Sequence, residues 1–451
     1  MSALRANRPL YRQFHVRMAA VAAVAACMVL PAQAQSLVEI YEAARAYDAT
    51  YLSARSQYEA NLARAEQAKA GLLPQAGVSA GANWNDRNSS VNALDGSFNS
   101  QNVTLSASQP LYRPANRAAS EQGELALEVA KAQLQAAEQE LIVRTTQAYF
   151  DVLAAQDTMT FVQAQKAAVA EQLAAAKRNF EVGTSTVTDS REAQARYDLV
   201  QAQEIAAEND LRVKKLALDQ LVGRSGVSPK PLMVPVALPA LSPADPEAWV
   251  REAEQRHPTI QQAAKGLDIA RLETAKAEAG HKPTLDLVGQ YQVARAPSSS
   301  ANIPGYVRNN TGTIGLQFNL PLFAGYAIQN RVKETVALEE KARTDLEAAR
   351  RGVTQATRSA YFGVLSGQGQ VKALEAAEAS SQSALEANQL GYQVGVRINI
   401  DVLNAQSQLF QTKRDLAQAR YNVLLGGLRL RQASGQLAPD DLRPIDAMLA
   451  R

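Results

Sequence analysis

The sequence repeats itself once, and this repeat constrains the fold more than any other feature. Ala148–Phe150 recurs as Ala360–Phe362, and Gly183 recurs as Gly395, both 212 residues further on. Motifs nearer the start of each copy keep a spacing of 209 residues. Because several separate motifs keep nearly the same spacing, we interpret the chain as two tandem copies of one unit of about two hundred residues.

The repeat sets the predicted domain organisation. A segment with six prolines separates the two copies, and because proline lacks an amide donor and fixes φ, we expect an extended linker there. The predicted divisions are a signal peptide at 1–34, a first repeat at 35–226, the linker at 227–246, a second repeat at 247–435 and a C-terminal tail at 436–451.

The start of the chain has the pattern of a secretory signal peptide. An Ala-rich apolar run over Met18–Leu30 follows a basic start and precedes an A-x-A site at Ala32–Ala34, so we predict cleavage after Ala34. The only cysteine, Cys27, ends a loose lipoprotein cleavage box, but the run continues to a better site and we predict no acylation. Removing four arginines leaves 43 basic against 44 acidic residues, which gives no electrostatic case for nucleic-acid binding.

Helices account for most of each copy. A helix of moderate length is predicted over Leu37–Ala70 and again over Pro246–Ala279. The stretches at about 118–181 and 327–390 contain no proline and hardly any glycine, and each would run roughly 95 Å as an unbroken helix. Apolar residues, many of them alanine, follow three-four steps along the first stretch, so we predict long antiparallel helical hairpins that turn at Gly183 and Gly395.

Four segments alternate apolar and small polar residues: Gln75–Asn85, Asn102–Leu111, Leu285–Val293 and Thr313–Leu322. An antiparallel sheet half-buried on the helices would alternate in the same way. The length of about ten residues in a secreted protein, with polar loops at Asp86–Gln101 and Ala296–Asn310, favours membrane strands. Four strands cannot close a barrel, whereas three chains supply twelve.

Two sets of motifs carry a resemblance to a known family. Pro110–Tyr112 and Pro321–Phe323 end strands in the two copies, and Tyr392–Leu403 has the pattern Y-x-V-G-x-R-x-x-x-D-V-L. The chain resembles the TolC family of outer-membrane export channels, and more its type I secretion and efflux members than the acylated multidrug-efflux branch.

The resemblance implies a mainly α fold with a membrane β-barrel. It implies a homotrimer whose chains share a twelve-stranded barrel in outer-membrane lipid and an α-helical tunnel in the periplasm. The implied function is export of proteins, small toxic compounds or both, with an inner-membrane transporter of the ABC or RND type and a periplasmic adaptor. The hairpins would open like an iris, with Gly183 and Gly395 as hinges.

The resemblance also implies a latch at the periplasmic tip. Tyr392 would contact Asp189, and Arg397 would contact Thr188 and Asp189, between the second hairpin and its neighbours. From the residues alone, Asp189 and Thr188 lie where a helix restarts, and helix capping is the simpler interpretation. Gating becomes the better hypothesis once the family is considered.

The resemblance assigns a pore constriction to the same region. Asp401 would form an inward-facing acidic ring, but the second acidic position of the family is Asn404 here. We therefore expect one carboxylate ring and weaker cation selectivity.

Catalysis finds little support in the sequence. His257 and His281 stand apart from any cysteine, and no hydrolase, metalloprotease or phosphate-loop motif is present, so no enzyme activity, cofactor or metal site is predicted. The alternative from another class is a structural or adhesive trimeric coiled-coil outer-membrane protein without channel activity. The inner-membrane partner would select the exported cargo.

Overall fold

The computed structural model describes residues 34–88, 96–233, 235–236, 238–298 and 305–450. The predicted signal peptide through residue 33, with Cys27, therefore lies outside the described residues. No helix in these ranges is both long and apolar enough to cross a membrane.

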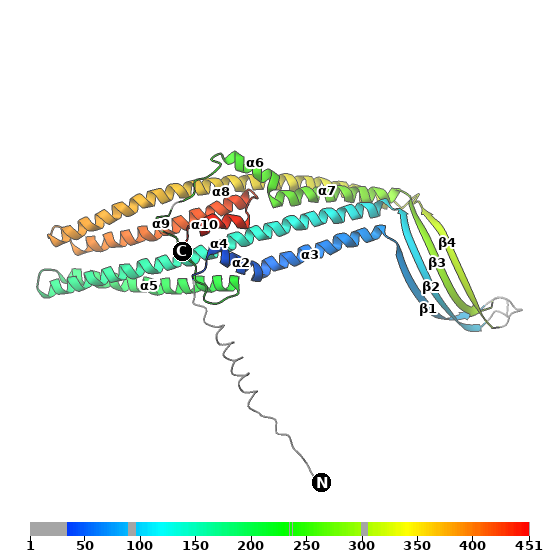
Figure 1. The fold of residues 1–451 in the computed structure, drawn as a ribbon, viewed down its shortest axis with the longest axis horizontal. Helices are drawn as coiled ribbons and strands as arrows, with labels where there is room; N and C mark the ends of the chain where they lie inside the picture. Colours follow the sequence, from blue (N-terminus) through cyan, green and yellow to red (C-terminus); the bar gives the residue numbers. More distant parts are fainter. Residues whose placement is uncertain (1–33, 89–95, 234, 237, 299–304, 451) are drawn as a thin grey trace, which may run out of the picture.

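The two copies contain the same elements in the same order: two shorter helices, two strands and two long helices (Figure 1). In the first copy these are α2 (Leu37–Tyr47), α3 (Ala49–Lys69), β1 (Gln75–Arg87), β2 (Gly96–Tyr112), α4 (Pro114–Glu181) and α5 (Val187–Val222). In the second they are α6 (Pro246–Arg256), α7 (Pro258–Glu278), β3 (Thr284–Pro297), β4 (Tyr306–Asn319), α8 (Ala327–Gln393) and α9 (Asn399–Ala433). The 3-10 turns η1 (Ala70–Leu72) and η3 (Ala279–His281) lead into β1 and β3, and η4 (Pro439–Leu442) and α10 (Arg443–Asp446) end the chain.

The first helix of each copy is broken, and the prediction of one continuous helix was wrong. Asp48 ends α2, caps α3 by accepting from the Tyr51 amide at 2.8 Å, and pairs with Arg144 at 2.7 Å. In the second copy the helix ends before His257, because Pro258 disfavours a helical conformation for the residue before it. His257 then caps α7 by accepting at Nδ1 from the Thr259 amide at 3.2 Å. Burial lowers the pKa of His257 below its ordinary value.

The four strands form one antiparallel sheet in the order β1-β2-β3-β4, so the β2–β3 pair joins the two copies. The strands have 13 to 17 residues and are longer than predicted, because pairing continues through the polar segments that were expected to be loops. The C-terminal end of β4 is shorter than predicted, because the strand stops at Asn319, before Pro321.

An ion pair lies where the sheet meets the helices. The β2–β3 register shifts between Pro110 and Tyr112, and the next residue, Arg113, makes two hydrogen bonds of 2.8 and 2.6 Å with the carboxylate of Asp286 in β3. Asp286 is buried. The end of the first copy's strand pair is thereby tied to the second copy.

The long helices form two hairpins, α4–α5 and α8–α9, that extend away from the sheet and end at the same end of the molecule (Figure 1). The largest apolar cluster lies at mid-length, where Tyr149, Phe150 and Tyr421 pack with α2 and the C-terminal segment. The segment predicted as a tail is part of this core: Leu442 is fully buried, and Asp446 accepts from the Leu37 amide at 2.8 Å.

Polar pairs connect the two hairpins along the contact between α4 and α9. They are Gln147–Arg429 at 2.9 Å, Asp157–Tyr421 at 2.7 Å and Gln165–Arg414 at 3.2 Å. Burial raises the pKa of Asp157, although the hydrogen bond from the Tyr421 hydroxyl opposes that shift.

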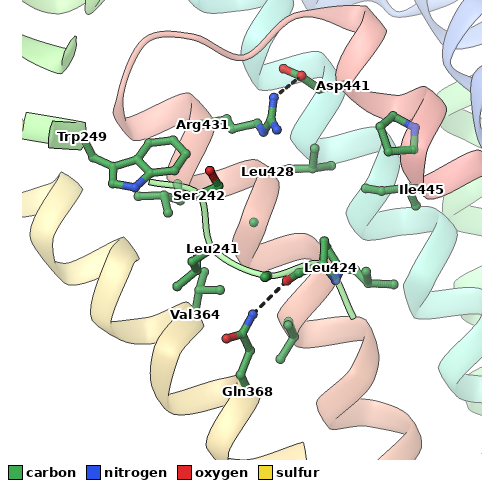
Figure 2. Close-up of a pocket in the computed structure, with 16 residues that line it drawn as sticks. Leu241, Ser242, Trp249, Val364, Gln368, Leu424, Leu428, Arg431, Asp441 and Ile445 are labelled. Carbon is green, nitrogen blue, oxygen red and sulfur yellow. Dashed lines mark hydrogen bonds and ion pairs between the residues drawn. The ribbon is translucent and has the colours of Figure 1, made fainter. Parts of the chain in front are cut away.

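The proline-rich linker packs against the second copy. Gln368 of α8 donates to the Pro239 carbonyl at 3.0 Å, and Trp249 donates to the Pro243 carbonyl at 2.9 Å. A mainly apolar cavity of about 130 Å³ remains between the linker, α8, α9 and α10, and the Arg431–Asp441 ion pair lies beside it (Figure 2). The cavity belongs to the packing of the linker.

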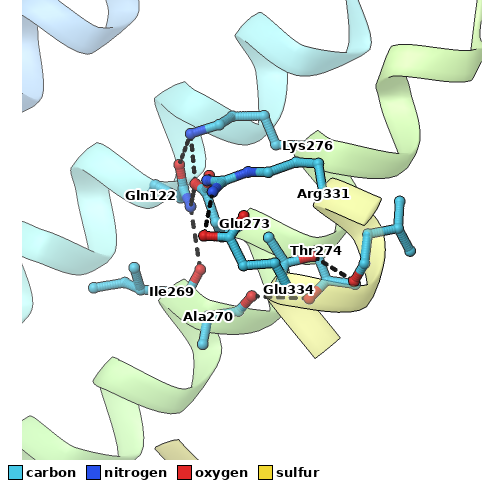
Figure 3. Close-up of polar contacts among 10 residues, drawn as sticks. Gln122, Ile269, Ala270, Glu273, Thr274, Lys276, Arg331 and Glu334 are labelled. Atoms are coloured by element: carbon cyan, nitrogen blue, oxygen red, sulfur yellow. Dashed lines mark hydrogen bonds and ion pairs between the residues drawn. The ribbon is translucent and has the colours of Figure 1, made fainter. Parts of the chain in front are cut away.

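A second polar cluster joins α4, α7 and α8 close to the sheet (Figure 3). Glu273 of α7 accepts from Arg331 at 2.7 Å, from Gln122 at 3.0 Å and from Lys276 at 2.5 Å. Burial would raise the pKa of Glu273, but these donors outweigh it and hold the pKa at about 2. The cluster therefore stabilises the ionised carboxylate where the two copies meet.

Candidate functional site

The two hairpin turns lie at one end of the molecule, opposite the sheet (Figure 1). Gly183 has φ of +79° and Gly395 has φ of +80°, in the left-handed region that glycine adopts without strain. Nothing lies within 4 Å of where a Cβ would be at either position. The backbone conformation, and not lack of space, therefore requires glycine at both predicted hinges.

The first turn ends in a complete helix cap. Asp189 and Thr186 form a reciprocal capping box at the start of α5, and the Ser185 hydroxyl donates to the Asp189 carboxylate at 2.7 Å. Hydrogen bonds from Ser185 and then from the Thr186 amide and hydroxyl lower the pKa of Asp189, against the effect of burial. The capping role that the local sequence indicated is thus present, and Thr188 beside it is exposed.

The second turn lacks this cap. Ile398 replaces the capping threonine at the start of α9 and makes no side-chain hydrogen bond there. The carboxylate of Asp401, in the first turn of α9, lies 3.7 Å from the Arg397 guanidinium.

Side chains from both hairpins meet near the tips. Asn179 of α4 donates to the Tyr392 hydroxyl at 3.2 Å, and Arg196 of α5 donates to the Asn404 side-chain oxygen at 2.6 Å. At the start of α9, Asn399 is buried and accepts from a glutamine of α4, while its own side-chain amide has no partner among the described residues. The second hairpin is therefore held to the first near the tip by hydrogen bonds and by apolar packing, since Leu403 of α9 is fully buried in the apolar cluster of the first hairpin.

In the described part of the single chain, Tyr392 and Arg397 make their polar side-chain contacts with Asn179 and Asp401. The latch contacts to Thr188 and Asp189 stay a prediction for an assembly of several chains. Asn179 and Arg196 were missed by the sequence analysis because neither stands in a motif: each is a polar residue inside a long helix.

Apolar side chains are exposed around both turns. Val182, Val394 and Val396 are 72%, 65% and 75% exposed. Near the second tip, Leu385, Val402 and Leu409 form a small buried apolar cluster, and Leu403 packs into the apolar cluster of the first hairpin. Among the described residues, no group of three histidine, cysteine or acidic side chains could hold a metal ion.

The comparison with protein families identifies a family over both copies. The sequence model described as "Outer membrane efflux protein" matches residues 40–224 and 249–436, which are the two copies without the linker.

Similar proteins cover nearly the whole length. Outer membrane protein TolC of Vibrio cholerae is 33% identical over 416 residues, 92% of this chain and 94% of that protein. Its counterpart in Escherichia coli K12 is 31% identical over 426 residues, with 93% and 86% coverage. The alkaline protease secretion protein AprF of Pseudomonas aeruginosa is 30% identical over 422 residues, with 92% and 87% coverage.

Solved structures show the same fold at lower identity. The outer membrane protein VceC of Vibrio cholerae superposes with a TM-score of 0.77 at 19% identity, over 88% of this chain and 96% of VceC. The open state of the MtrE outer membrane channel of Neisseria gonorrhoeae gives a TM-score of 0.72 at 20% identity, over 90% of each chain.

Proposed function

The chain belongs to the outer membrane efflux protein family, whose members are transport proteins of the outer membrane and not enzymes, and from that premise we propose that three chains form one export channel. The cargo would be proteins, small toxic compounds or both, since a relative is named for protease secretion and the family for efflux. The proposal rests mainly on the sheet, because a single chain leaves both of its edge strands unpaired.

The sheet has two unpaired edges, β1 and β4, and an apolar face. Val78, Ile314 and Leu316 are 71%, 85% and 66% exposed in one chain. In lipid each unpaired backbone group would lose its hydrogen bonds to water, so the edges must be paired by strands of other chains. Twelve strands from three copies would close the barrel and leave a lumen.

The internal repeat also supports a ring of chains in the helical part of the molecule. Phe150 of α4 is buried against Tyr421 of α9, whereas its counterpart Phe362 of α8, 212 residues on, is 55% exposed. If the contact between neighbouring chains follows the contact within a chain, then α8 of one chain packs on α5 of the next chain. That helix has a row of exposed apolar residues to receive it: Leu199, Ile205, Val213 and Leu216.

We propose that the second hairpin, which turns at Gly395, is the moving part of the gate, and that the first hairpin, which turns at Gly183, stays in place. In the closed ring, Arg397, whose side chain is 59% exposed, would reach Thr188 or Asp189 of a neighbour. An exposed ion pair is worth about 1 kcal/mol, so three copies would bias the closed state by a few kcal/mol. A partner that binds the open state more tightly can reverse a bias of that size.

The partners we propose are an inner-membrane transporter of the ABC or RND type and a periplasmic adaptor. The exposed valines of the two turns offer an apolar surface at the end where such an adaptor would arrive. Which transporter and adaptor bind decides the cargo.

The test is single-channel conductance of the purified protein in a planar bilayer, after its trimeric state has been checked. Small, steady currents are expected from a channel narrowed at one end. A folded trimer without conductance would overturn the proposal and favour a structural role.

A further inference from the structure

One contact near the tip joins an arginine to Asn404, which the family resemblance places at the pore constriction. Arg196 of α5 donates from Nη2 to the Asn404 side-chain oxygen at 2.6 Å, and Arg196 is half-buried while Asn404 is exposed. Because Asn404 follows Asp401 by three residues in α9, the two side chains lie on one face of that helix, about one turn apart. The guanidinium of Arg196 is thus held by a neutral partner, Asn404, which lies about one helical turn from Asp401.

The charge balance at this place differs from that of a plain acidic ring. Asp401 has Arg397 at 3.7 Å on its tip side and Arg196 beside the next turn. If residue 404 were a carboxylate, it would neutralise Arg196 and leave the charge of Asp401 in place. Since Asn404 carries no charge, the positive charge of Arg196 remains and opposes Asp401.

Other charges on α5 were weighed in the same way. Asp189 is held in its capping box, and Glu192 lies one turn before Arg196 and opposes it in part. Arg191 is exposed on the same helix. These charges stay the same when Arg196 is substituted, so that substitution isolates the effect of the charge of Arg196.

We propose that Arg196 determines the charge selectivity of the channel at its narrow end. With one Arg196 beside each Asp401, the constriction would discriminate little between cations and anions and would resist block by multivalent cations. This inference rests on the proposed channel function and adds a selectivity residue to it. Fields in a narrow, partly water-excluded passage act strongly on permeating ions, so a change of one charge per chain is measurable.

The experiment measures the reversal potential of the purified trimer in a KCl gradient near 0.1 M salt. At this concentration the field of an exposed charge extends about 10 Å before salt screens it. Arg196→Gln removes the charge, and Asn404→Asp neutralises it by a different route. The matched control is Arg191→Gln, which removes one arginine from the same helix. Trimer content and thermal stability are checked for each variant.

Both Arg196→Gln and Asn404→Asp are expected to raise the K⁺ to Cl⁻ permeability ratio by about threefold and to introduce block by hexaamminecobalt(III). Arg191→Gln should leave both quantities near the wild-type values. Reversal potentials of the two test variants that match the control would overturn the selectivity role while conductance upholds the channel. A folded wild-type trimer without conductance would instead overturn the channel function, and this inference with it.

Discussion

The polar cluster around Glu273 allows a quantitative test of what holds the two copies together near the sheet. Glu273 accepts hydrogen bonds from Gln122, Lys276 and Arg331, and its pKa is about 2, against an ordinary value of 4.5. One unit of pKa difference corresponds to about 1.4 kcal/mol, so ionised Glu273 contributes at most about 3 kcal/mol per chain. Because the folded pKa is the lower one, this contribution is complete above pH 4.5 and is lost as the pH falls toward 2.

Glu273→Gln keeps the shape of the side chain and removes its charge. At pH 7 the variant should lose about 1–3 kcal/mol in the free energy of unfolding, because Arg331 and Lys276 lose their shared carboxylate. Near pH 2 the variant and the wild type should be equally stable. Urea unfolding followed by helical circular dichroism, at one fixed protein concentration, measures both values.

The control for this prediction is Glu334→Gln, which removes a more exposed partner of Arg331, with 55% of its side chain exposed. We expect a loss within about 0.5 kcal/mol at any pH, as is usual for exposed ion pairs. The reasoning would be refuted if Glu273→Gln and the wild type lost stability in parallel between pH 4.5 and 2, or if the two variants were alike at pH 7.

Three further predictions concern the gate, the helix seam and the C-terminal segment. Tyr392→Phe combined with Arg397→Ser should raise single-channel conductance severalfold if these residues hold the tip closed, whereas an unchanged conductance in an intact trimer would leave them only a local structural role. Asp157→Asn keeps an acceptor for Tyr421 and removes a buried charge; because the folded pKa is raised, the variant should gain up to about 1 kcal/mol at pH 8 and nothing at pH 3 in urea unfolding. Removal of residues 438–451 uncovers the central core and should abolish trimers on native gels, and normal trimer yield would contradict the packing described for this segment.

Much of the fold could be predicted because its signals are periodic. The repeat gave two equivalent halves, the three-four spacing gave the long helices, and alternation gave four strands. Strand length could not be predicted in the same way, since Gly96–Gln101 and Tyr306–Gly312 are mostly polar or glycine and yet pair along the full ladder. Backbone pairing, which has little sequence signal of its own, extends these strands.

The tip was predicted in part. Gly183 and Gly395 could be identified because a positive φ leaves a residue signature, and the capping pattern before Asp189 is local. The contact between Arg196 and Asn404 joins residues 208 positions apart and needs the packing of α5 against α9. Pairing of that kind is set by three-dimensional structure, so one sequence without relatives does not reveal it.

The differences between the two copies indicate which hairpin can move. Thr186 and Asp189 close the first turn with a full capping box, while Ile398 and Asp401 at the equivalent positions do not. A missing cap typically costs a helix about 1 kcal/mol, and the second tip also has the smaller apolar cluster. An opening motion follows the least stable contacts, so we expect it to begin in the second hairpin, where it must exchange the hydrogen bonds to the first hairpin for water and also uncover Leu403. We therefore expect the first hairpin to act as the fixed wall of the proposed gate and the second hairpin as its moving part.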